Sequence, residues 1–214
     1  MLCYITDRRQ FPGSDTDQRQ RLLDKIAEAA LAGIDYIQLR EKDLSARELE
    51  ALAHHAVRVL HAETQKNAGS IPGTRLLINS RTDIALATGA DGVHLRADDI
   101  LPSEVHEPWM RSEPGSVRPI LGVSCHSVTD VEKAEQQGAD FVLFGPVFEK
   151  QGKQTTGLEV LRQASHRKVP VLALGGVTLA NAATCLAAGA AGVAAIRLFQ
   201  ENNIAEVVRE LDQR

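Results

Sequence analysis

A glycine, followed by a short acidic or small spacer and then an apolar run, recurs four times along the chain. The four glycines are Gly33, Gly89, Gly138 and Gly189, and they lie at nearly equal spacing. Each follows an Ala- or Leu-rich run of helical character, where a left-handed C-terminal cap favours glycine, and each precedes a short β-like run. The pattern divides the chain into four similar quarters, each with room for two strands and two helices.

Alternating strand and helix patterns fill these quarters. We expect helices at 18–32, 45–64, 82–88, 127–137, 157–166, 178–188 and 203–213, with a weaker one near 102–111. The expected strands are Leu2–Thr6, Asp35–Leu39, Leu76–Asn79, Gly92–Leu95, Ile120–Val123, Phe141–Phe144, Val171–Leu174 and Val193–Ile196. Nearly continuous apolar strands that alternate with helices predict a parallel sheet covered on both faces. Eight such units favour an α/β fold consisting of a single (β/α)8 TIM barrel domain over residues 1–214. An open doubly wound sheet is the alternative, and the fourfold repetition argues against it.

Composition excludes several classes of function. With 43% hydrophobic residues, 214 residues can bury a sizeable core. Lys and Arg number 24 against 28 Asp and Glu, and aromatics make up 4%, which argues against nucleic-acid binding. Three cysteines without metal-ligand spacing indicate buried thiols in a reducing compartment. The chain lacks an apolar run of membrane-spanning length, so we expect a cytoplasmic protein. Its oligomeric state, monomer or homo-oligomer, stays open.

Polar residues follow nearly every expected strand, which is where ligands bind in such a barrel. In an extended strand Gln38, Arg40 and Lys42 would share one face, and an amide with two cations suits an anionic ligand. An ordinary solvated strand end is the alternative. The other strand ends carry Thr6-Asp7, Asn79-Ser80-Arg81, His94 through Asp99, Ser124-Cys125-His126, Gly145-Pro146, Gly175-Gly176 and Ile196-Arg197.

Two features of these strand ends indicate more specific roles. Gly175 and Gly176 follow the seventh strand and precede a helix, so their backbone N–H groups predict a phosphate site; plain turn residues are the alternative. His94 or His126 could serve as a general base near neutral pH, or could be satisfied by local hydrogen bonds.

The chain resembles the thiamine phosphate synthase family, together with the thiazole tautomerases that share its fold. The similarity lies in the order and spacing of Tyr4-Ile5-Thr6-Asp7, Gln38 through Asp43, Leu77-Ile78-Asn79, Ala90 through Leu95, Gly122-Val123-Ser124, Gly145 through Phe148 and Ala173 through Val177. The resemblance implies a transferase of thiamine biosynthesis. It would join 4-amino-2-methyl-5-pyrimidinylmethyl diphosphate to a thiazole phosphate and release pyrophosphate. The small phosphorylated substrates would be its partners, and Mg²⁺ its cofactor.

Residue roles follow from the same resemblance. Asp99 would bind the metal, Ser124 would touch the leaving group, and Lys153 would close over it. Gln38, Arg40, Lys42 and Asn79 would hold the pyrophosphate, and Gly175-Gly176 would seat the thiazole phosphate, with His94, Ile196 and Arg197 completing the substrate site. Catalysis would fall to Arg40, Ser124 and Lys153.

The chain departs from the family pattern at four places. Ser80 replaces one of two expected metal carboxylates, so we expect weakened Mg²⁺ binding. Arg96-Ala97 stands where the family has Gly-Gln, and Arg96 could partly replace the metal as a fixed cation. The loop Glu149–Thr156 keeps a lysine but lacks the preceding threonines. Arg197, where the family has a small residue, could bind the thiazole phosphate or fill its pocket.

Two other functions remain open at this stage. The first is a thiazole phosphate isomerase like the tautomerases, which needs no metal and tolerates Ser80. Against it, their acid/base histidine corresponds to Pro146. The second is a catalytically degenerate homologue that binds a phosphorylated ligand for regulation.

Overall fold

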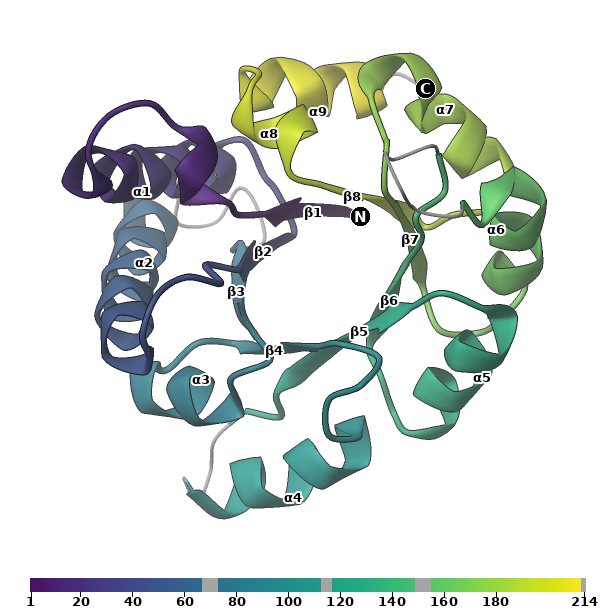
Figure 1. The fold of residues 1–214 in the computed structure, drawn as a ribbon, viewed down its shortest axis with the longest axis horizontal. Coiled ribbons are helices and arrows are strands. Elements are labelled where there is room, and N and C mark those ends of the chain that lie inside the picture. Colours follow the sequence, from purple (N-terminus) through teal and green to yellow (C-terminus); the bar gives the residue numbers. More distant parts are fainter. Residues whose placement is uncertain (67–72, 113–116, 149–154, 213–214) are drawn as a thin grey trace.

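Eight parallel strands close into a barrel surrounded by helices, in the order β1 to β8 with β8 paired to β1 (Figure 1). The structure is a computed structural model that describes residues 1–66, 73–112, 117–148 and 155–212. The strands are β1 (Leu2–Ile5), β2 (Tyr36–Leu39), β3 (Arg75–Asn79), β4 (Gly92–Leu95), β5 (Ile120–Cys125), β6 (Phe141–Phe144), β7 (Val171–Leu174) and β8 (Gly192–Ala195). The predicted (β/α)8 TIM barrel is confirmed.

The outer helices also match the expected ones, with differences at three places. They are α1 (Asp15–Leu31), α2 (Ala46–Lys66), α3 (Thr82–Thr88), α4 (Pro102–Ser112), α5 (Val128–Gln136), α6 (Gly157–Ser165), α7 (Leu179–Ala187), α8 (Arg197–Gln200) and α9 (Ile204–Asp212). Helix α1 begins three residues earlier than predicted, because Ser14 and Asp17 form a capping box. The short helix α8 and the 3₁₀ turn η1 (Arg8–Gln10) were not predicted. In the described part of the chain, every helix is too short or too polar to cross a membrane.

The four repeated glycines end their helices in the same way. All four have positive φ, between 68° and 97°. The residue after each glycine donates its N–H to a carbonyl five positions earlier, as Ala90 does to Ala85 at 3.1 Å. The left-handed backbone that each turn requires explains why glycine recurs there.

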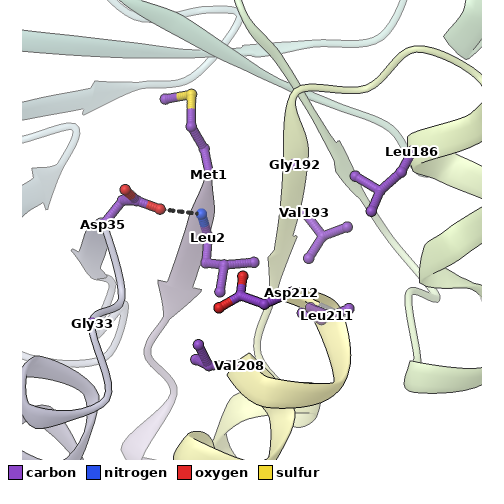
Figure 2. A pocket seen from close by; sticks show the side chains of 10 residues that line it. All are labelled: Met1, Leu2, Gly33, Asp35, Leu186, Gly192, Val193, Val208, Leu211 and Asp212. Atoms are coloured by element: carbon purple, nitrogen blue, oxygen red, sulfur yellow. Dashed lines mark hydrogen bonds between the residues drawn. The ribbon is translucent and has the colours of Figure 1, made fainter. Parts of the chain in front are cut away.

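The acidic residue of the repeat has a structural role that the sequence pattern did not reveal. Asp35 accepts the N–H of Leu2 at 2.6 Å (Figure 2), Asp91 that of Leu76 and Asp140 that of Leu121, both at 2.8 Å. Each carboxylate thus ties the start of one strand to the preceding strand of the barrel. The fourth repeat has Ala191 instead, and its carbonyl accepts the amino group of Met1 at 2.9 Å.

The core has two layers, one between strands and helices and one inside the barrel. The inner layer contains Cys3, Ile5, Leu77, Phe141, Leu143, Leu172 and Ala194. The rings of Tyr36 and Phe141 stack there with centroids 4.6 Å apart. Apolar side chains therefore fill the barrel from its amino end, and polar groups begin higher up, toward the carboxyl ends of the strands.

Candidate active site

Gln38, Asn79, His94 and Ser124 lie on the inner face of the barrel, near the carboxyl ends of their strands. Their strand neighbours, such as Leu39, Val93 and Val123, belong to the outer core layer, and alternation turns these polar side chains inward. Asn79 pairs with His94 in the barrel register, and the Ser124 hydroxyl lies 3.4 Å from His94 Nε2. Four consecutive strands, β2 to β5, therefore bring polar groups to one arc of the rim.

Two buried polar atoms in this arc lack hydrogen-bond partners among the described residues. They are Gln38 Nε2 and His94 Nδ1, in side chains that are each 2% exposed. Leaving a buried donor or acceptor unsatisfied costs about 1–3 kcal/mol. Such groups occur where a ligand or an ordered water completes the hydrogen bonds.

His94 is a hydrogen-bonding group and not a base near neutral pH. Its pKa is lowered from 6.5 to about 3, mainly by burial; Asp99 partly opposes the shift and Arg40 adds to it. The structure thus disfavours the general-base role that the sequence left open for His94. At the end of β5, His126 is exposed, and its Nδ1 contacts the carbonyl of Gly145.

Positive charge concentrates beside the same arc. Arg40 follows β2, is half-buried, and has its pKa lowered by desolvation and by the nearby Arg96, against the opposing effects of Asp7 and Glu41. Arg96 pairs with Asp98 and Asp99, whereas desolvation disfavours the charge of Arg40. Arg40 is therefore suited to an anionic ligand. Lys42 lies farther along, because β2 ends at Leu39 and the chain turns there; its side chain is exposed.

Asp99, the expected metal ligand, already accepts several hydrogen bonds. Its carboxylate accepts the N–H of Arg96 at 2.7 Å, Arg96 Nε at 3.3 Å and the hydroxyl of Ser80. Partial burial raises the pKa of Asp99, but these bonds outweigh it and the pKa is lowered. Within the described ranges, no three His, Cys, Asp or Glu side chains gather as a metal site. One carboxylate still fits Mg²⁺ that arrives with a diphosphate, because Mg²⁺ commonly combines one or two carboxylates with substrate phosphates.

The turn after β7 contains two adjacent glycines, both with left-handed backbone. Gly175 and Gly176 have φ of 93° and 67°, and the carbonyl of Gly176 accepts Asn181 Nδ2 at 2.9 Å. A Cβ on Gly175 would lie 2.6 Å from the Cα of Pro146, so this turn fits against the segment after β6 only without a side chain. Helix α7 begins directly behind it with a Thr178–Asn181 capping box.

Of the three remaining predicted residues, two lie on or beside the rim, and the third is outside the described part of the chain. Ile196 packs partly against the inner core, and the exposed Arg197 begins α8. Lys153 falls outside the described residues.

Sequence reasoning missed Arg8, which is 3% exposed and contacts the end of β2. Its neighbours Glu41, Asp43 and Asp15 lie 7 to 35 positions away in the sequence, and no local pattern connects them.

A cavity of about 270 Å³ opens at the opposite end of the barrel (Figure 2). Leu2, Asp35, Leu186, Val193 and Asp212 are among its lining residues. It lies where the strands begin, whereas ligands of this fold bind where they end. The rim is therefore the better candidate for the active site.

Comparisons with known proteins show which family the sequence and the fold resemble. The family model described as thiamine monophosphate synthase matches residues 2–199. A putative thiamine-phosphate synthase of Geobacter sulfurreducens is 44% identical, covering 91% of this chain and 84% of its own. The putative thiamine-phosphate synthase 2 of Aquifex aeolicus is 38% identical, covering 94% and 97%. Among solved structures, a thiamine phosphate pyrophosphorylase from Pyrococcus furiosus superposes with a TM-score of 0.77 at 28% identity, covering 99% of this chain and 93% of that one.

Proposed function

The chain belongs to the thiamine monophosphate synthase family, and we propose that its barrel rim is where the family's transferase reaction takes place. The substrates are small phosphorylated molecules: an aminopyrimidine-methyl diphosphate and a thiazole phosphate. The C–O bond to the diphosphate breaks, and pyrophosphate leaves with the electron pair. The thiazole nitrogen then supplies the pair that forms the new C–N bond. The observation that carries the proposal is the convergence of Gln38, Asn79, His94 and Ser124 beside Arg40.

Each rim group has a chemical role in this proposal. Arg40 and Lys42 neutralise the charge that grows on the departing pyrophosphate, and such preorganised charges are often the largest contribution to catalysis. Gln38 and Asn79 hydrogen-bond the pyrophosphate, and Ser124 touches the leaving group. Gly175 and Gly176 hold the thiazole phosphate through backbone N–H groups. Beside it, Arg197 and Ile196 border the thiazole. Lys153 is proposed to close over the leaving group.

Two further groups complete the proposed site. His94 stays neutral and keeps Nδ1 available for a substrate atom. Asp99 is the proposed Mg²⁺ ligand, and a bound metal would neutralise part of the diphosphate charge. Arg96 lies against Asp99 and would supply a fixed cation there.

The test is a reaction with both substrates, with and without Mg²⁺, followed by chromatography of the products. We expect thiamine phosphate and pyrophosphate in equal amounts, with faster turnover when Mg²⁺ is present. Isomerisation of the thiazole phosphate in the absence of the pyrimidine would support a tautomerase instead. Ligand binding without either reaction would indicate a degenerate binding protein.

Replacing Ser80 by aspartate is expected to strengthen divalent-metal binding about tenfold, because it adds a second carboxylate next to Asp99. The position accepts this change, since Ser80 has a φ of 61° and aspartate tolerates that left-handed backbone well. Titration with Mn²⁺ alone, followed by the rise in melting temperature, measures the effect.

Ser80→Asn is the matched control, because asparagine has nearly the same shape and backbone tolerance without the charge. We expect its Mn²⁺ titration to resemble that of the unchanged protein. Equal metal affinity of the Asp and Asn variants would contradict the placement of the metal at Asp99.

A further inference from the structure

A buried chain of hydrogen bonds lies directly behind Arg40. The hydroxyl of Thr6, which is fully buried after β1, accepts the backbone N–H of Arg40 at 2.9 Å. The same hydroxyl donates to Glu41 Oε1 at 2.5 Å. One threonine therefore joins the backbone of Arg40 to the side chain of the residue that follows it.

Arg8 holds Glu41 in this position. The backbone N–H of Arg8 donates to Glu41 Oε2 at 3.0 Å, and Nη1 donates to the same atom at 3.2 Å. The side chains of Arg8 and Glu41 are only 4% and 1% exposed. A buried, hydrogen-bonded pair with several contacts has little freedom to move.

Two further carboxylates fix Arg8 in turn. Asp43 accepts both Nη1 and Nη2, at 2.7 and 2.9 Å, and Asp15 in the first turn of α1 accepts Nε and Nη2. The hydrogen bonds that Arg8 donates to Asp43, Asp15 and Glu41 outweigh burial and raise the pKa of Arg8. Burial raises the pKa of Glu41, while hydrogen bonds from Thr6 and Arg8 oppose the shift. The loop after β1, the end of β2 and the start of α1 thus meet at one guanidinium.

This network lies on the side of the chain opposite the polar arc of the rim. Leu39 belongs to the outer core, and Glu41 binds Thr6 and Arg8 behind the strand end. Arg40 lies between Leu39 and Glu41 in the sequence, and the charges of Asp7 and Arg96 act on its guanidinium group. These hydrogen bonds hold both the Glu41 side chain and the backbone N–H of Arg40 in place. They therefore fix the direction in which the Arg40 side chain leaves the backbone.

We propose that Thr6 and Glu41, held by Arg8, are positioning residues that aim Arg40 at the diphosphate. The inference rests on the proposed function, because it requires Arg40 to bind that group. Holding a charged group in place before the ligand arrives removes an ordering cost from binding, and a displacement of about 1 Å can cost about a hundredfold in rate.

The test uses the full chain and isothermal titration with two probes, pyrophosphate and inorganic phosphate, in the presence of Mg²⁺. Thr6→Val keeps the shape of the side chain and removes both hydrogen bonds. We expect pyrophosphate affinity to fall about tenfold or more, and phosphate binding at the Gly175–Gly176 turn to stay unchanged. In turnover, KM for the pyrimidine diphosphate should rise while KM for the thiazole phosphate does not.

Three more variants separate positioning from general damage. Thr6→Ser restores the hydroxyl and should recover pyrophosphate affinity, and Glu41→Gln should weaken it even if Thr6→Val fails to fold. Thr74→Val is the matched control, because that buried hydroxyl donates to the Ile34 carbonyl at 2.7 Å at the far end of the barrel. It should bind both probes as the unchanged protein does.

The outcomes distinguish this inference from the proposed function. If Arg40→Gln loses pyrophosphate binding but Thr6→Val and Glu41→Gln do not, the positioning role is wrong and the proposed function stands. Equal losses for pyrophosphate and phosphate would also overturn positioning, because they would indicate a general structural defect. If the unchanged protein does not bind pyrophosphate, both proposals fail.

Discussion

Replacing Arg40 by glutamine is expected to lower kcat/KM for the pyrimidine diphosphate about 10²–10³-fold, the effect typical of removing one preorganised donor at a developing negative charge. The side chain is half-buried beside Arg96, and desolvation lowers its pKa, so its charge is held at an electrostatic cost. A bound diphosphate would offset that cost. Steady-state kinetics with each substrate varied in turn measures the loss.

Arg118→Gln is the matched control for this prediction. Arg118 also carries a guanidinium, but it precedes β5 and pairs with Asp140 at the end of the barrel where the strands begin. We expect less than about a twofold change in kcat/KM, since exposed ion pairs contribute little. Similar losses in both variants would mean that net charge, and not the position of Arg40, governs binding.

The free energy of unfolding is expected to depend on pH through His94. Its pKa is about 3 in the folded state against 6.5 for an exposed histidine, because burial disfavours the charged ring. The unfolded chain therefore binds the proton more readily. The contribution of His94 to the free energy of unfolding is fully present above pH 6.5. It declines as the pH drops below 6.5 and continues to decline until about pH 3. Between pH 6.5 and pH 5 the free energy of unfolding should fall by about 2 kcal/mol through His94.

Urea unfolding of His94→Gln at both pH values tests this. The variant should lose about 2 kcal/mol less than the unchanged protein between pH 6.5 and pH 5. Ile5→Val, another change inside the barrel, should cost about 0.5–1.5 kcal/mol equally at both pH values. An unchanged pH slope in His94→Gln would contradict the assignment of the linkage to this histidine.

Much of the fold could be predicted because its signals are local. Glycine at Gly89 or Gly138 reflects the left-handed turn that ends a helix, and apolar strands of regular spacing need no tertiary information. The start of α1 at Asp15 also has a local signal that the prediction overlooked, since Ser14 and Asp17 have capping-box spacing. The strand-end rule brought Gln38 and His94 to one rim.

What sequence reasoning could not predict depends on contacts between distant segments. Lys42 does not continue the strand, because β2 ends at Leu39 and the chain then turns. The hydrogen bond from Ser80 to Asp99 requires the loops after β3 and β4 to meet. The Arg8 network joins three segments, and only the closed barrel brings them together.

The repeated turns and the carboxylates Asp35, Asp91 and Asp140 secure the barrel where its strands begin, far from the polar rim. The residues that hold the strands together are therefore separate from the residues of the rim. Substitutions at Ser80, Arg96 or Arg197 would leave these hydrogen bonds between strands intact.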